Sequence, residues 1–289
     1  MKLLLSLFLS LLISSANAGF SEALDALKTG DFKTAIFNLE KEIDKSEDDT
    51  FTPMLYAVLA NSYYQAPDDI DNDYKLAFKN YLIASKRFDA TVQYKLGVMY
   101  DTGQGVEQDF TKAIEYFEQS IKYKEKPYSL WRLGKIYLLG KGVTKDYDKA
   151  KEYFERAEAV GDANSQFELA HMHEYGKGIP ISLPRAIHYY EKSAEQGDAD
   201  AQYKLDLLLG KVDKKDWHAD FETALDFTYG YTVDVDFDKA IEYYQKAADK
   251  GSAVSLYNIG FIVNLTSKTK QSKLELEYYK KSAELGNIY

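Results

Sequence analysis

The chain has 289 residues, a formal charge of −10, 45% hydrophobic residues, 25 tyrosines and no cysteine. This much apolar material can build an extensive core and excludes an intrinsically disordered chain. The acidic balance opposes binding to nucleic acid or to an anionic membrane surface, and the lack of cysteine excludes disulfides and cysteine-linked lipid anchors.

Residues 1–18 have the pattern of a secretory signal peptide. Lys2 precedes an uncharged run from Leu3 to Ile13, and Ala16-Asn17-Ala18 places small residues at the two positions that a signal peptidase reads. The run is far shorter than the ~20 residues that span a bilayer, so we expect cleavage after Ala18 and no stable membrane insertion. The expected mature chain, residues 19–289, is periplasmic or secreted.

The stretch from Leu96 to Tyr123 is typical of a helical hairpin, and its spacing returns from Leu133 and from Leu169. In the first copy an apolar helix breaks at Gly103 and Gly105, and an Asp-started helix follows. An alanine early in each second helix marks the copies, with a glutamate in the last: Ala35, Ala77, Ala113, Ala150, Ala186, Ala240 and Glu275. Most of the intervals are close to 36 residues, which predicts stacked antiparallel helix pairs, about seven in all.

The positions around each marker have structural explanations. Four residues before the marker we predict helix N-caps, at Asp31, Asp73, Asp109, Asp146, Ser182, Asp236 and, less typically, Gln271. Prolines 53, 127 and 184 fall near expected helix starts, where a missing N–H costs nothing. An aromatic pair three and four residues after the marker predicts core packing, and so does the small residue that follows the first-helix leucine.

These tandem copies resemble the Sel-one-like repeat, a branch of the tetratricopeptide superhelix. The pattern positions are filled by Leu96, Gly97, Tyr100, Gly103, Gly105, Val106, Asp109, Ala113 and Tyr116. The match is tightest over residues 92–199 and 225–286. The resemblance implies an all-α fold, a right-handed superhelical solenoid over residues 19–289.

Three segments depart from the pattern. Residues 20–90 lack the Gly-x-Gly turn, and the last unit replaces that turn with NLTSKTKQSK. Between Leu205 and Leu225 about half a repeat is inserted, giving an irregular segment over about residues 206–224. Either one helix is lengthened there or an extra helix protrudes.

We find no strong catalytic or metal-binding pattern. His171 and His173 are two residues apart on an expected helix, so they point in different directions, and we expect structural histidines. Asp69, Asp71 and Asp73 imitate the opening of a calcium loop, but the required glycine and final glutamate are missing. Ser267 and Lys270 form an isolated S-x-x-K without partner motifs. We therefore predict no catalytic residue, no metal and no cofactor.

Variable side chains on the first helices are the candidate contact residues. The resemblance implies that first helices line the concave surface of the superhelix. We define the inner face of each first helix by two positions: the residue directly before its leucine or isoleucine, and the residue two after it. The predicted partner-contact residues are Lys95, Val98, Arg132, Lys135, Glu168, His171, Lys204, Leu207, Asn258 and Phe261. Such a groove suits an extended peptide or a protein surface.

The sequence therefore predicts a non-enzymatic periplasmic or secreted scaffold that binds a partner protein or peptide in this groove. One alternative is an immunity protein that neutralises an envelope-targeted toxin, a role that some proteins with this repeat have. Another is a cell-envelope hydrolase or penicillin-binding activity, which the missing cysteines and the missing nucleophile context oppose.

Overall fold

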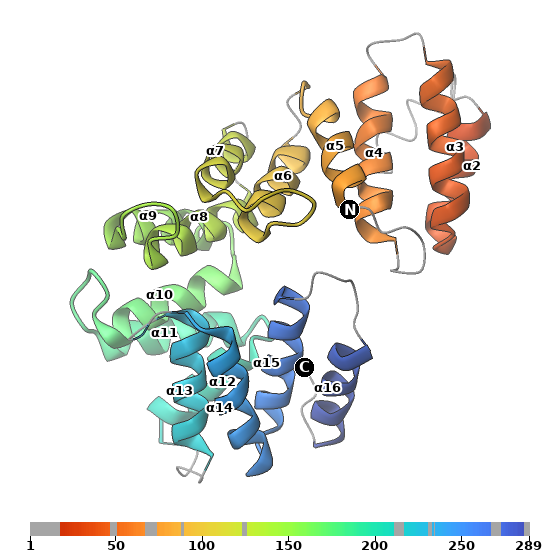
Figure 1. The fold of residues 1–289 in the computed structure, drawn as a ribbon. Coiled ribbons are helices and arrows are strands. Elements are labelled where there is room, and N and C mark those ends of the chain that lie inside the picture. Colours follow the sequence, from red (N-terminus) through yellow and green to blue (C-terminus); the bar gives the residue numbers. More distant parts are fainter. Residues whose placement is uncertain are drawn as a thin grey trace. The chain divides into compact units, whose positions relative to one another are not determined.

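The computed structural model describes residues 18–46, 51–66, 74–87, 90–122, 126–210, 217–230, 233, 235–266 and 273–285. These residues form fifteen helices and no strand (Figure 1). The expected signal sequence before Ala18, the acidic run at 69–73 and the S-x-x-K at 267–270 lie outside the described residues. The prediction of an all-α fold is confirmed.

The helices alternate between first and second members of hairpins. The first helices are α2 (Ala18–Thr29), α4 (Thr52–Gln65), α6 (Ala90–Thr102), α8 (Pro127–Leu139), α10 (Ala163–Tyr175), α12 (Ala199–Leu208), α13 (His218–Tyr229) and α15 (Ala253–Thr266). The second helices are α3 (Phe32–Lys45), α5 (Tyr74–Ala84), α7 (Phe110–Ile121), α9 (Tyr147–Glu158), α11 (Leu183–Ala194), α14 (Phe237–Asp249) and α16 (Lys273–Glu284). Each second helix packs on the first helix before it, except that α14 pairs with α13 and leaves α12 without a second helix. The predicted seven helix pairs are thus confirmed.

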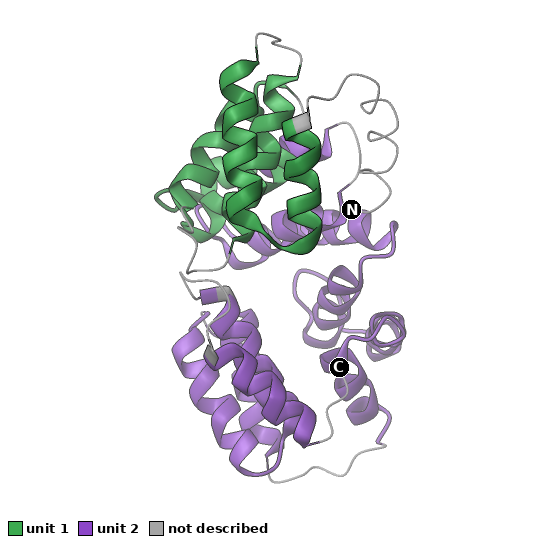
Figure 2. Ribbon diagram, turned by 90° about the vertical axis from the view of Figure 1, so that its right-hand side faces the viewer, with its two compact units in different colours: residues 1–116 green, residues 117–289 purple. Residues whose placement is uncertain are grey.

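The chain divides into two compact units, residues 1–116 and 117–289, which we call unit 1 and unit 2 (Figure 2). The boundary lies inside α7. The apolar core of unit 1 joins α2 to α6 through residues such as Leu39, Leu59 and Leu96. The cores of unit 2 are built by the same positions of later repeats, including Phe154, Leu169 and Tyr190.

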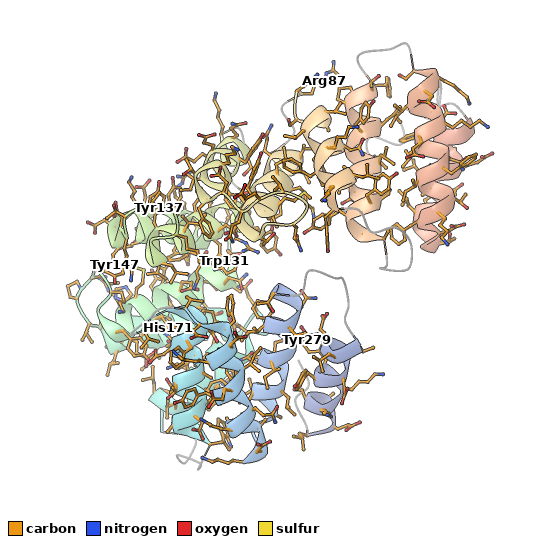
Figure 3. The ribbon with its side chains drawn as sticks, in the orientation of Figure 1. Arg87, Trp131, Tyr137, Tyr147, His171 and Tyr279 are labelled. Carbon is orange, nitrogen blue, oxygen red and sulfur yellow. The ribbon has the colours of Figure 1, made fainter. Side chains whose placement is uncertain are left out.

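The repeat pattern has a clear structural origin in the second helices. Asp146 accepts a hydrogen bond from the Lys149 backbone N–H and so caps α9. The Lys149 ammonium lies 4.8 Å from the centre of the Tyr137 ring, which stacks on Tyr153 with a centroid distance of 5.8 Å (Figure 3). Cap, cation and aromatic pair therefore fix α8 to α9, and the same three contacts recur between α6 and α7 and between α13 and α14.

Four of the predicted caps are confirmed and one is not, and the other two, Asp73 and Gln271, lie outside the described residues. The carboxylates of Asp31, Asp109 and Asp236 accept from the backbone in the same way as Asp146. Ser182 occupies the N-cap position of α11, but its side chain forms no capping hydrogen bond. Pro184 follows as the second helical residue and has no N–H, so one of the usual donors to a cap is missing.

Two glycines are needed because backbone or ring atoms approach closely. A Cβ atom on Gly105, where φ is +72°, would lie 2.1 Å from the Tyr74 carbonyl oxygen. A Cβ atom on Gly134 would lie 2.4 Å from the Phe154 ring. The predicted close helix approach after the first-helix leucine is confirmed at Gly134.

The irregular segment joins two first helices, α12 and α13, that follow each other without a second helix between them. Helix α12 ends at Leu208 and α13 begins at His218, so neither alternative from the sequence describes the segment fully. Helix α12 does not protrude, because its residues Ala201 and Leu205 are buried in a core with Ala186 and Tyr190 of α11. Residues 211–216 between the two helices lie outside the described residues.

Candidate functional site

The predicted contact residues differ widely in exposure. On unit 2, Glu168, His171, Lys204 and Asn258 are buried, whereas Phe261 is 41% exposed. Arg132, Lys135 and Leu207 are half-buried. On unit 1, Val98 is buried and Lys95 is half-buried.

Helix α13 accounts for much of the burial in unit 2, because it packs against the inner face of other first helices. The Tyr229 ring lies 5.6 Å from Phe167 and 6.3 Å from His171, both on α10, measured between ring centroids. The Lys135 ammonium of α8 lies 4.7 Å from the centre of the same Tyr229 ring. Side chains that would line a groove in a regular stack therefore lie beneath a helix of the same chain.

Lys204 is the most completely buried cation of this inner face. Its ammonium donates to Glu222 of α13 at 2.6 Å and to the Tyr175 hydroxyl at 2.8 Å, and it lies 3.6 Å from Glu174. The Tyr190 hydroxyl donates to Glu174 at 2.6 Å. Burial lowers the pKa of Lys204, but the carboxylates of Glu222 and Glu174 more than compensate, so its pKa lies above the ordinary value.

Lys135 and Glu168 form a second ion pair of the inner face, with 2.9 Å between ammonium and carboxylate. Arg132, on the same helix as Lys135, extends over a ring instead, with its guanidinium carbon 5.2 Å from the centre of Trp131. Two of the predicted contact residues therefore bind each other.

The two histidines of α10 pack against different rings. His171 is fully buried, stacks on Tyr175 and meets Phe167 edge to face at 4.6 Å (Figure 3). Burial, with the charges of Lys204 and Lys135 nearby, holds the pKa of His171 well below its usual range, so this histidine is neutral at pH 7. His173 is also buried and stacks on Tyr189. Both are structural, and the described residues contain no group of three acids or histidines arranged to hold a metal ion.

Asp200 connects three helices of unit 2. Its carboxylate accepts from the Asn258 amide of α15 at 3.0 Å and from the Tyr229 hydroxyl of α13 at 3.4 Å. Burial, and then the nearby charge of Asp198, raise the pKa of Asp200 to about 7. Asp198 is the N-cap of α12, where its carboxylate accepts from the backbone N–H groups of Asp200 and Ala201. The repeat pattern does not reveal the role of Asp200, which resembles a solvated acid in the first turn of α12.

The inner face of unit 1 has a different composition. The Lys95 ammonium of α6 lies 4.3 Å from the centre of the Tyr64 ring of α4, and the Tyr64 hydroxyl donates to Gln104 at 3.1 Å. In the part of the chain that the structure describes, no carboxylate forms an ion pair with Lys95. Burial lowers the pKa of Lys95 below its ordinary value.

Sequence reasoning missed the α4 members of this face. Leu59 precedes a small residue, Ala60, and Tyr63 follows four positions on, which is the spacing of the later first helices. The corresponding inner-face positions are therefore Val58 and Asn61, and both are half-buried. The Asn61 side-chain oxygen accepts from Gln65 at 3.0 Å.

The inner face offers groups suited to binding. The buried Tyr190 and Tyr244 and the half-buried Tyr229 have pKa values raised well above the usual range, chiefly by desolvation, so they stay protonated. A half-buried ammonium above an aromatic ring, as at Lys95, is suited to a charge-assisted hydrogen bond with a carboxylate.

The fold and the inner face define an α-helical hairpin repeat protein. The Sel1 repeat model matches residues 56–87, 90–122, 127–162, 163–198, 224–252 and 276–287, more than half of the chain. The protein therefore belongs to the Sel1 repeat family. The matches leave out α12, which agrees with its lack of a second helix.

Solved structures of bacterial proteins share the fold. A Sel1 repeat protein from Oxalobacter formigenes is 24% identical, with 91% of this chain and 98% of that chain covered and a TM-score of 0.57. The protective antigen c5321 of uropathogenic Escherichia coli is 22% identical, with 94% of this chain and 65% of that chain covered and a TM-score of 0.54. A tetratricopeptide repeat protein from Parabacteroides merdae is 15% identical, with 89% and 97% covered and a TM-score of 0.52. None of the curated proteins compared with this chain matches it.

Sel1 repeat proteins are generally scaffolds for protein–protein interaction and are typically non-enzymatic. Among the helices that the structure describes, none has both the length and the apolarity that crossing a bilayer requires.

Proposed function

We propose that this protein is a non-enzymatic scaffold of the bacterial envelope, periplasmic or secreted, that binds a partner protein or peptide through the inner face of its first helices. Its repeat family supports the scaffold role. The signal-peptide pattern of residues 1–18 supports the location, and the bacterial origin of the similar structures supports the host.

The observation that carries this proposal is the contrast in coverage between the two inner faces. In unit 2, α13 packs over Lys204 and His171, and both are buried. In unit 1, Val58, Asn61 and Lys95 remain partly exposed on neighbouring first helices. The accessible recognition surface that we propose is therefore centred on α4 and α6.

Some inner-face residues of unit 2 remain proposed contacts. Arg132 and Leu207 are partly exposed, and Phe261 is exposed. Lys135 is a poor choice for charge reversal, because a glutamate there would place a second carboxylate against Glu168. Binding experiments are better directed at unit 1.

Site-specific photo-crosslinking tests the proposal in cells. A photoreactive amino acid at Asn61 samples the inner face, and the same residue at Lys79 of α5 or at Phe37 of α3 samples exposed positions of second helices. We expect a discrete protein adduct from position 61 and none from positions 79 and 37. Adducts from the two second-helix positions alone would contradict the proposal.

The same experiment bears on the alternatives. A toxin as the partner crosslinked at position 61 would make the protein an immunity protein, which is a special case of the proposed binding role. Hydrolysis of cell-wall substrate or covalent capture of a β-lactam by the purified chain would instead overturn the non-enzymatic role.

A further inference from the structure

Lys95 and Lys204 occupy the same place in two different repeats. Each directly precedes the first-helix leucine, Leu96 on α6 and Leu205 on α12. Each ammonium contacts a tyrosine of the preceding first helix in its unit. The Lys95 ammonium lies 4.3 Å from the centre of the Tyr64 ring, and the Lys204 ammonium donates to the Tyr175 hydroxyl at 2.8 Å, with the ring centre 5.3 Å away. The chain thus contains two copies of one lysine–tyrosine contact.

The two copies differ in their carboxylates. Glu222 of α13 bonds to Lys204 at 2.6 Å, and Glu174 of α10 lies 3.6 Å away. The tyrosine Tyr63 stands directly before Tyr64, where the α10 helix has Glu174 before Tyr175. Across the described ranges, Lys95 has no ion-pair partner at all. Burying an ammonium without a counter-charge is costly, and a partly buried charged group of this kind marks a candidate binding site.

Helix α13 shows what kind of ligand completes this arrangement. Glu222 and Tyr229 are seven residues apart, which places them on one side of the helix. Glu222 reaches Lys204, and the Tyr229 ring receives the Lys135 ammonium at 4.7 Å. A helix that presents an acidic and an aromatic side chain two turns apart is therefore the occupant that the protein itself places on an inner face.

We propose that the inner face of unit 1 binds a helical segment of a partner protein that presents an Asp or Glu carboxylate to Lys95, with an aromatic residue two turns away. This inference rests on the proposed function and names the chemistry of the partner at that same surface. The carboxylate forms a charge-assisted hydrogen bond with the Lys95 ammonium above Tyr64, as Glu222 does with the Lys204 ammonium beside the Tyr175 hydroxyl. Because the chain carries a formal charge of −10, the attraction is local, and the Lys95 contact provides it.

A synthetic copy of α13 serves as the probe. The peptide comprises residues 217–230, WHADFETALDFTYG, and is held helical by a lactam bridge on the side that points away from Glu222. It is labelled and titrated against the full mature chain, whose unit 2 face already holds its own α13. We expect saturable binding that weakens about tenfold in the E222Q peptide and about tenfold in the Lys95→Met protein.

Two controls make this experiment decisive. Lys79→Met removes an exposed lysine of unit 1 and leaves the affinity unchanged. Combining the E222Q peptide with the Lys95→Met protein weakens binding no further than either change alone, because both remove one contact. Absence of binding, or equal binding by the wild-type and E222Q peptides, overturns the inference.

The outcome also separates the inference from the proposed function. If position 61 crosslinks to a partner but the peptide does not distinguish Lys95→Met from wild type, the scaffold role stands and the acidic-helix inference fails. If position 61 gives no adduct, the proposed recognition surface itself fails.

Discussion

Lys95 in unit 1 and Lys204 in unit 2 occupy equivalent positions in two different repeats, but their electrostatic surroundings are opposite. Lys204 is buried with two carboxylates, and its pKa is raised above the ordinary value. Among the described residues Lys95 lies over a tyrosine ring and has no carboxylate partner, and burial lowers its pKa. One repeat position can therefore be fully buried or partly exposed, depending on which helix covers it.

The covering helix follows from the spacing of the repeats. The markers Ala186 and Ala240 are 54 residues apart, against 36 between Ala150 and Ala186. The additional first helix, α12, has no second helix, and α13 then packs against the inner faces of α8, α10 and α12. The irregular segment thus converts part of the inner face of unit 2 into core.

The largest effect is expected at Lys204. Lys204→Met removes the cation from Glu222 and Glu174 and leaves their carboxylates close together, so we expect unit 2 to lose about 3 kcal/mol of unfolding free energy. Urea unfolding followed by tryptophan fluorescence measures this loss, because the two tryptophans, Trp131 and Trp217, both lie in unit 2. Lys192→Met, which disrupts a more exposed ion pair with Glu158, is the control and should change little. An unchanged urea midpoint for Lys204→Met would contradict the claim that the ion pairs of Lys204 stabilise unit 2.

A smaller, pH-dependent effect is expected at Asp200. Its pKa in the folded protein, about 7, lies above the ordinary value of 3.8, so the folded state holds this proton more tightly than the unfolded chain does. The stability from this group is fully present below pH 3.8 and is lost as the pH rises through 7. The free energy of unfolding of wild type relative to Asp200→Asn should therefore fall between pH 4 and 7, by at most about 1.4 kcal/mol per pH unit, and level off above.

Urea titrations of both proteins across this pH range provide the measurement. The difference between the two proteins isolates Asp200 from His171, Lys204 and the other titrating groups nearby. A difference that does not vary with pH would show that Asp200 titrates as an ordinary carboxylate and that the helices α12, α13 and α15 are joined in some other way.

Lys95→Met is expected to change the unfolding free energy in the opposite direction from Lys204→Met. The methionine keeps the apolar stem and removes a half-buried charge that has no carboxylate partner among the described residues, so we expect unit 1 to gain about 1 kcal/mol of unfolding free energy. Hydrogen exchange at the backbone amides of α4 and α6 reports on unit 1, and Lys79→Met is the matched control. Faster exchange in Lys95→Met would mean that Lys95 stabilises the fold and is not kept for binding.

The smallest effect concerns the ring beneath Lys95. A double-mutant cycle with Tyr64→Leu and Lys95→Met should give a coupling free energy of about 0.5 kcal/mol, the size expected for a partly exposed cation–π contact. The same hydrogen-exchange measurement yields all four corners of the cycle. No coupling would indicate that the position of Lys95 over Tyr64 carries no energy.

The sequence was sufficient for much of the fold, because its signals are local. The Asp caps at 31, 109, 146 and 236 and the close approach at Gly134 each depend on a few neighbouring residues. Ser182 shows the limit of such signals, because it occupies the N-cap position of α11 but its side chain forms no capping hydrogen bond.

The surroundings of the inner face could not be predicted in the same way. Glu168 of α10 and Lys204 of α12 are charged residues on the inner faces of their helices, and such residues are typical of a solvated surface. Their burial depends on α13, which begins 14 residues after Lys204 and covers them only in the folded chain. The sequence identifies the inner-face positions but not which of them the chain covers itself, and contact of the ten predicted residues with a partner stays a prediction.

The most direct test of the contrast is to titrate the two lysines in the full chain by NMR of carbon-13 at the ε position, with Lys95→Met and Lys204→Met providing the assignments. We expect Lys95 to titrate below its ordinary value of 10.5 and Lys204 above the same value. A pKa for Lys95 at or above 10.5 would mean that it has a carboxylate partner in the free protein, and would contradict the claim that this cation awaits one from outside.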